Sequence, residues 1–134
     1  MMVLPPAVVV HGLDHARVAL AAGVPVTLLS GAEAGLYAGA GWWRALIVAS
    51  GTAGPDILDC GDAPGRAMEA LHTGCRLIVL DPAVPAWNLV AARAAAAGAV
   101  LLDIRPLALD MGVRGAGRRL AVWLNVAGRA DASA

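Results

Sequence analysis

The segment of residues 56–81, DILDCGDAPGRAMEALHTGCRLIVLD, constrains the fold more than any other part of this chain. It holds two short apolar runs, at 57–58 and 77–80, on either side of a Gly/Pro loop and an amphipathic stretch. About 20 residues separate the starts of the two runs, which suits a crossover helix and is too many for a hairpin. The segment therefore predicts a strand, a helix and a second strand parallel to the first.

Cap and turn residues mark the ends of the helix that is expected inside this segment. Asp62 precedes the helix and is expected to act as its N-cap, accepting a hydrogen bond from the backbone N–H of Gly65. Pro64 falls in the first turn and Gly74 follows the last one, positions at which these residue types are common. The apolar stripe of this helix consists of Ala67, Met68, Ala70 and Leu71.

The rest of the chain contains further copies of this unit. The expected strands are 7–10, 26–29, 57–58, 77–80 and 100–102, and further helices are expected at 14–22 and 87–97. Such alternation predicts a single three-layer α/β domain, with about five parallel strands and helices on both faces of the sheet. The flavodoxin-like strand order 2-1-3-4-5 is favoured, and an open fragment of a βα barrel is the second arrangement.

Two segments are ambiguous between strand and helix. A strand at 46–48 would leave roughly seven residues before Ile57, too few for a parallel crossover. A helix there places Trp42, Trp43, Leu46 and Ile47 on one apolar face, so a helix is predicted. Residues 118–125 are expected to form a terminal helix, with an edge strand as the alternative. The domain is expected to span residues 1–127, followed by a polar tail at 128–134.

Composition excludes several classes of function. The formal net charge is zero and all 10 basic residues are Arg, with no basic patch of the size that nucleic acid requires. The absence of Lys excludes Schiff-base chemistry and a P-loop. No GxGxxG motif follows the first expected strand, which argues against a dinucleotide site. The spacing of the 2 Cys and 3 His matches no familiar zinc motif, and the sequence identifies no cofactor.

The sequence also bears on the location of the protein. The N-terminus, MMVLPP, lacks the charged and apolar regions of a signal peptide, and no uncharged run is long enough to span a bilayer. The 2 Cys lack the spacing of a disulfide framework. We therefore expect a cytoplasmic protein that does not contact membranes.

The candidate functional residues lie where expected strands end. In an open parallel sheet, ligands bind at the carboxyl ends of the strands. The predicted ligand-binding residues are His11, Ser30, Cys60, Gly61, Asp62, Asp81 and Asp103, and Arg105 falls at the same edge. With the order 2-1-3-4-5, the crevice lies between the first and third strands and is lined by His11, Gly61 and Asp62. The expected ligand is a small polar or anionic molecule, although helix capping also explains Asp62 and Asp81.

An enzyme using acid/base or Cys60 chemistry is the alternative function. Cys60 and Arg66, with five residues between them, resemble the loop of cysteine phosphatases and sulfurtransferases. The resemblance covers this loop alone and implies that a Cys60 thiolate attacks phosphorus or sulfur while Arg66 and loop N–H groups hold the oxyanion. Two positions depart from the pattern: Asp62 adds negative charge to the anion cradle, and Ala67 replaces the usual hydroxyl residue.

Two adjacent tryptophans predict self-association. Trp42 and Trp43 are about 100° apart around a helix, so one contact with a sheet does not cover both. Tryptophan is common at the centre of interfaces, and symmetric dimers are the commonest closed assemblies. We therefore expect a homodimer with Trp42 or Trp43 at its centre. A structural or partner-binding subunit of a larger assembly is the remaining alternative function.

Overall fold

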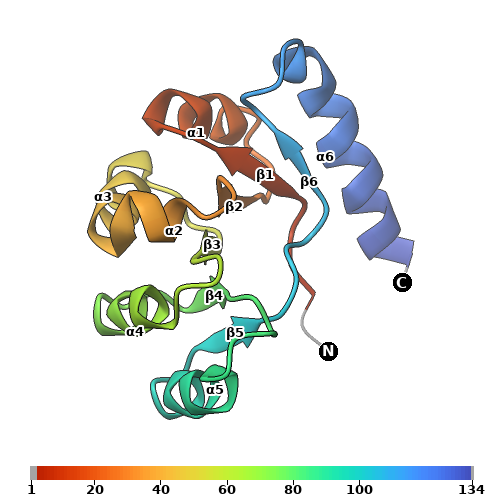
Figure 1. The fold of residues 1–134 in the computed structure, drawn as a ribbon. Helices are drawn as coiled ribbons and strands as arrows, with labels where there is room; N and C mark the ends of the chain where they lie inside the picture. The colour runs from red at the N-terminus through yellow and green to blue at the C-terminus, as the bar shows by residue number, and fades with distance from the viewer. Residues whose placement is uncertain (1–2, 134) are drawn as a thin grey trace.

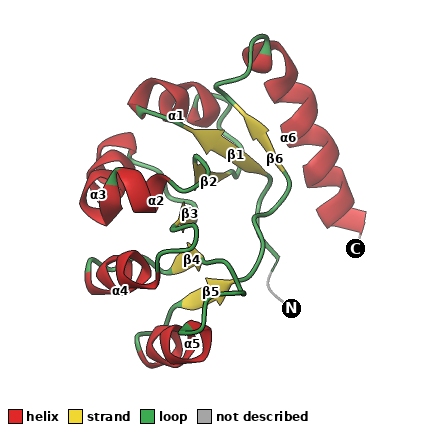
Figure 2. Ribbon diagram, viewed as in Figure 1, coloured by secondary structure: helices red, strands yellow, loops and turns green. Residues whose placement is uncertain are grey.

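Over residues 3–133 strands and helices mostly alternate, and the six strands found there form one parallel sheet (Figures 1 and 2). The computed structural model describes the backbone of residues 3–133 and the side chains of residues 3–125. The strands are β1 (Ala7–Val10), β2 (Thr27–Ser30), β3 (Asp56–Asp59), β4 (Leu77–Val79), β5 (Val100–Leu102) and β6 (Ala108–Asp110). The helices are α1 (Leu13–Leu20), α2 (Ala34–Tyr37), α3 (Gly39–Ser50), α4 (Pro64–His72), α5 (Trp87–Ala96) and α6 (Ala116–Ser133). The predicted α/β class with a parallel sheet is confirmed.

The strand order is β5-β4-β3-β2-β1-β6, so strands β1 to β5 lie side by side in the order of the sequence. The predicted order 2-1-3-4-5 is wrong, and the sequential order is that of the second arrangement, an open fragment of a βα barrel. Right-handed crossovers that use the same face of a sheet always add the next strand on the same side. To add the next strand on the other side, as the order 2-1-3-4-5 requires, a crossover helix must pack on the opposite face of the sheet. The hydrophobic periodicity of a helix does not specify which face it packs on.

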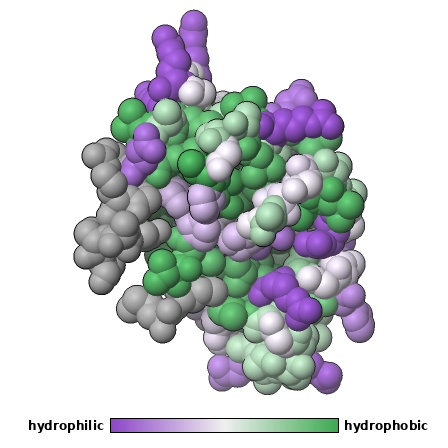
Figure 3. Space-filling model, turned by 180° about the vertical axis from the view of Figure 1, so that it is seen from behind, coloured by the Kyte–Doolittle hydropathy of each residue, from purple (hydrophilic) through white to green (hydrophobic). Residues whose placement is uncertain are grey.

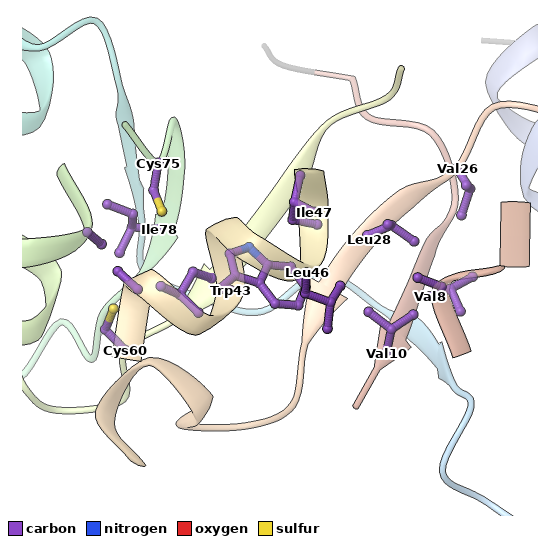
Figure 4. Close-up of a cluster of buried hydrophobic side chains, with 14 of the residues drawn as sticks. Val8, Val10, Val26, Leu28, Trp43, Leu46, Ile47, Cys60, Cys75 and Ile78 are labelled. Carbon is purple, nitrogen blue, oxygen red and sulfur yellow. The ribbon is translucent and has the colours of Figure 1, made fainter. Parts of the chain in front are cut away.

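Two clusters of buried side chains occupy the two faces of the sheet. The larger joins alternate strand residues, such as Val8 and Leu28, to side chains of α1, α3, α4, α5 and α6. Figure 4 shows part of this cluster, including Trp43 of α3. The smaller consists of Val9, Leu29, Ile57, Leu77 and Val79, packed against Leu4, Leu102 and Ala108, and includes no residue of a helix. Among the described side chains the helices therefore cover one face, and the prediction of helices on both faces is wrong.

Strand β6 was not predicted, and its position depends on the curvature of the sheet. Only residues 103–107 connect β5 to β6, at the opposite edge of the sheet. This link spans roughly 20 Å at most, whereas five strand spacings in a flat sheet come to roughly 24 Å. Figure 1 shows the solution: the sheet curves, and the link crosses its open side from β5 to β6. Arg105 belongs to this link and therefore lies at the open side of the curved sheet.

The two ambiguous segments are both helical, as predicted. In α3, the side chains of Trp43, Leu46 and Ile47 are buried, whereas Trp42 is 37% exposed. The indole Nε1–H of Trp43 donates a 2.9 Å hydrogen bond to the Asp56 carboxylate. Helix α6 excludes the edge-strand alternative for 118–125 and continues to Ser133. The division into a domain at 1–127 and a tail at 128–134 stays a prediction, because side chains after Asn125 lie outside the described residues.

Candidate functional site

A buried carboxylate organises the carboxyl edge of the sheet. Asp59, the last residue of β3, has a side chain that is only 5% exposed. Its Oδ2 accepts a 2.7 Å hydrogen bond from Arg105 Nη1, and its Oδ1 accepts a 2.7 Å hydrogen bond from the backbone N–H of Gly61. Both oxygens of the Asp59 carboxylate are therefore paired. Asp59 follows Ile57 by two residues, so alternation along the strand turns it toward the face that no described helix covers.

Arg105 extends this network to the end of β2. Its Nη2 donates a 3.0 Å hydrogen bond to the backbone carbonyl of Ser30. The buried Ser30 hydroxyl accepts a 2.9 Å hydrogen bond from the Asp59 backbone N–H and donates a 3.0 Å bond to the Gly31 carbonyl. The predicted ligand contact Ser30 thus has a hydroxyl that is engaged within the protein. Its role in this structure is to tie β2 to β3 beneath the 103–107 link.

A cleft opens beside this network at the ends of β3, β4 and β5. It encloses about 490 Å³. The cleft is lined by Ala32, Glu33, Asp59, Gly61, Asp62, Val79, Leu80, Asp81, Pro82, Asp103, Ile104 and Arg105. Four of the predicted ligand-binding residues, Gly61, Asp62, Asp81 and Asp103, thus come together here. Glu33 and Asp59 also line the cleft and were not predicted, although alternation with Ile57 is a sequence signal that indicates Asp59.

Glu33 is held over the cleft by an uncommon backbone conformation. It is the one described non-glycine residue with positive φ, at φ 60° and ψ 18°. Its side chain packs on Gly61, where an added Cβ would lie 2.9 Å from Glu33 Cγ. Gly61 itself has φ 60°, so this position suits glycine for two reasons. Non-glycine residues in the left-handed region cluster at ligand sites, where the surrounding structure compensates for the strain.

The cleft is rich in negative charge. Its lining contains five carboxylates, those of Glu33, Asp59, Asp62, Asp81 and Asp103, and one guanidinium, that of Arg105. The guanidinium already faces Asp59, so four carboxylates line the cleft without compensation from this Arg. Among the described residues, no group of three or more His, Cys, Asp or Glu is arranged to hold a metal ion. The arrangement therefore offers many hydrogen-bond acceptors to a ligand, spread over the cleft walls.

The capping roles predicted for two of these acids are wrong. The N-cap of α4 is Ala63, and no side chain makes a capping hydrogen bond there, so Asp62 does not cap this helix. The chain turns at Gly61 with a positive φ, which moves the helix start one residue later than the Asp62 interpretation requires. Asp81 accepts a 2.9 Å hydrogen bond from the backbone N–H of Ala83, but α5 begins only at Trp87. Asp81 therefore stabilises a turn, and Asp62 is exposed at the cleft.

Cys60 lies outside the cleft. Its side chain is fully buried in the helix-covered cluster (Figure 4). Burial, the nearby thiol of Cys75 and the carboxylate of Asp59 raise the pKa of Cys60 to about 12. Arg66 is paired with Glu69 at 3.0 Å on the surface of α4. These features are the opposite of the exposed low-pKa thiolate that the resemblance to cysteine phosphatases implies.

His11 lies apart from the acidic cleft, because β2 separates β1 from β3. The predicted crevice between the first and third strands, lined by His11, Gly61 and Asp62, therefore does not exist. Instead, His11 Nε2 lies 2.7 Å from Asp110 Oδ1, at the neighbouring ends of β1 and β6. A separate hollow of about 310 Å³, lined by residues 11–15, opens beside it.

Comparison with known proteins returned no matching family model, no matching curated protein and no matching solved structure. In the part of the chain that the structure describes, none of the helices combines the length and the apolar character needed to cross a membrane.

Proposed function

We propose that this chain is a ligand-binding module whose ligand is a small polar molecule carrying amino or hydroxyl groups. The observation that carries this proposal is the acidic cleft of about 490 Å³ at the ends of β3, β4 and β5. It lies at the edge of the sheet where parallel α/β proteins bind ligands. The strained Glu33 that lines it also favours a binding role.

The charge of the cleft narrows the expected ligand class. Arg105 is bonded to Asp59 and to the Ser30 carbonyl, so its charge is compensated within the protein. Carboxylates accept hydrogen bonds and repel anions, so a ligand that donates from ammonium or hydroxyl groups complements this lining. Of the two ligand types expected from the sequence, the polar one is therefore retained and the anionic one is not.

A matched trio of sugars tests the proposal. Glucosamine, glucose and glucose 6-phosphate share a ring and differ in charge. We expect glucosamine to raise the melting temperature most, because a ligand that binds only the native state stabilises it by mass action. Glucose 6-phosphate should have the smallest effect. Spermidine, a flexible polyamine, extends the same measurement to cations without a ring.

Asparagine variants locate the binding. Asp62→Asn and Asp103→Asn each keep the side-chain shape and remove one charge from the cleft, and each should weaken glucosamine binding roughly threefold to tenfold in calorimetry. Asp14→Asn, at an exposed position in α1, is the matched control and should leave the affinity unchanged. Equal binding of the three sugars, or equal loss in all three variants, would contradict an acidic cleft that selects amines.

Two further expectations stay proposals. The predicted homodimer retains Trp42 as its centre, since Trp43 is fully buried and cannot form a surface contact. Figure 3 shows one face of the molecule, on which hydrophobic residues, in green, lie exposed among hydrophilic ones, in purple. The cytoplasmic location rests on the cysteines, both of which are free and buried.

A further inference from the structure

A carboxylate and an imidazole form a fixed pair at the ends of β1 and β6. His11 Nε2 lies 2.7 Å from Asp110 Oδ1, and the same oxygen accepts a 2.8 Å hydrogen bond from the backbone N–H of Gly112. The two residues are 99 positions apart in the chain. The parallel pairing of β1 with β6 brings them together, because Val9 is in register with Asp110. Both side chains stay partly accessible, with 44% and 43% of their surface exposed.

Two glycines make room for the imidazole ring. A Cβ added at Gly31 would lie 2.9 Å from His11 Nδ1, and a Cβ added at Gly112 would lie 2.9 Å from His11 Cδ2. Neither glycine has a positive φ, so backbone conformation does not require glycine at these positions. Glycine is required instead because the space next to the His11 ring is too small for a side chain. Side chains at either position would displace the ring from Asp110.

The hydrogen bonds define which nitrogen of His11 carries the proton. Partial burial raises the pKa of Asp110, but the hydrogen bonds from Gly112 and His11 outweigh it and hold that pKa below its ordinary value. Asp110 is therefore an anion at neutral pH and accepts a hydrogen bond from the N–H of His11 Nε2. In the neutral imidazole the lone pair then resides on Nδ1. A carboxylate that orients a histidine in this way is the usual support of a general base.

The surroundings of this pair supply a place for a substrate. The hollow of about 310 Å³ is lined by residues 11–15 and so includes His11 itself. His15 stands edge-on to the His11 ring, with centroids 5.6 Å apart, and its Nδ1 accepts a 3.1 Å hydrogen bond from the His11 backbone N–H. The titratable groups next to the His11 imidazole are thus His15 on α1 and Asp110 on β6, and Asp14 on α1 lines the same hollow.

We propose that His11 is the proton-accepting residue of a general acid–base site for a hydroxyl group of a small molecule in this hollow. The O–H bond breaks, the proton forms a bond to Nδ1, and the oxygen keeps the electron pair and becomes a nucleophile. The charge of Asp110 balances the imidazolium that results. This site is separate from the acidic cleft, and the proposal does not depend on the ligand of that cleft.

Hydrolysis of 4-nitrophenyl acetate is a suitable probe of this chemistry, since water supplies the hydroxyl. Water gives a proton to Nδ1, its oxygen bonds to the acetyl carbon, and 4-nitrophenolate leaves with the electrons of the ester bond. The proton on Nδ1 then passes to the solvent. We expect the rate to fall at least roughly tenfold in His11→Asn. Asp110→Asn should also lower the rate roughly tenfold, because the imidazolium loses its counter-charge.

An exposed histidine elsewhere provides the matched control. His72→Gln, at the end of α4, should leave the rate unchanged. A wild-type rate equal to that of His11→Asn would overturn the proposal. Nitrogen-15 NMR of the unmodified protein tests it without any variant: the neutral His11 ring should carry its proton on Nε2. A proton on Nδ1 would likewise overturn the proposal, because no lone pair would then be available there.

Discussion

Arg105 Nη1 donates a 2.7 Å hydrogen bond to Asp59 Oδ2, joining two residues that are 46 positions apart. The Asp59 side chain is 5% exposed and that of Arg105 is 28% exposed, so this ion pair is shielded from water on its acidic side. The pair also fixes the 103–107 link over the ends of β2 and β3, since Arg105 bonds to Ser30 as well. One interaction thus holds the edge of the sheet and one wall of the acidic cleft.

Replacing Arg105 with Ala should destabilise the protein strongly. The change leaves the buried carboxylate of Asp59 without its counter-charge, which costs roughly 2–4 kcal/mol. Urea unfolding measures the loss. Arg66→Ala is the matched control, because Arg66 pairs with Glu69 where both side chains are exposed, and should cost less than about 0.5 kcal/mol. Equal losses in the two variants would show that the buried pair contributes no more than a surface one.

Replacing Gly31 with Ala should separate His11 from Asp110 while leaving most of the stability intact. The added Cβ would approach His11 Nδ1 to 2.9 Å, and the partly exposed ring can swing toward solvent. Gly12→Ala is the neighbouring control, since a Cβ there meets nothing within 4 Å. NMR chemical shifts of the His11 ring should move in Gly31→Ala and stay in place in Gly12→Ala. A shift of equal size in both variants would contradict the packing argument.

The sequence predicts the elements of this fold better than their arrangement. The apolar runs at 57–58 and 77–80 and the helical spacing of Trp43, Leu46 and Ile47 are local signals, and the structure has strands and a helix there. Strand order depends on which face each crossover helix takes, and periodicity alone does not carry that information. Strand β6 has only three residues, all half-buried, so it lacks the strong apolar signal of the others.

The candidate site was predictable to a similar extent. The rule that ligand residues follow parallel strands placed Gly61, Asp62, Asp81 and Asp103 at the same edge, and they do line one cleft. Pairs across the sheet were not predictable, because the partner of Asp59 depends on the link at 103–107 and the partner of His11 depends on β6. Both partners follow from the curvature of the sheet and from the link that crosses its open side.

The contribution of Asp110 to stability should disappear in acid. Its pKa in the folded protein lies below the ordinary value of 3.8, so the folded state favours the ionised form. A depressed pKa stabilises the fold above the ordinary value, and this stabilisation is lost as the pH falls through the folded pKa. The stability difference between the wild type and Asp110→Asn should therefore shrink as the pH falls below 3.8. Denaturant unfolding at pH 5 and pH 3 measures it, and a difference that grows between these two pH values would contradict the sign.

The Cys60 thiol should react slowly with iodoacetamide at pH 6. Burial raises its pKa to about 12, so the reactive thiolate is scarce, and the side chain is fully enclosed. Mass spectrometry of the alkylated protein should show little modification of Cys60 in the native state and complete modification in urea. Arg66→Ala should not change the native rate, because Arg66 pairs with Glu69. Rapid native alkylation that is lost in Arg66→Ala would restore the phosphatase-like function.

Self-association should depend on Trp42 and not on Trp43. Trp42 is 37% exposed on α3, while Trp43 is enclosed in the core with its indole N–H bonded to Asp56. An exposed tryptophan supplies the large apolar contact that interface centres favour. Light scattering at micromolar concentration should give a dimer mass for the wild type and a monomer mass for Trp42→Ser. Val122→Ser, an exposed apolar position on α6, is the control and should stay dimeric. A monomer mass for the wild type, unchanged in Trp42→Ser, would refute the homodimer.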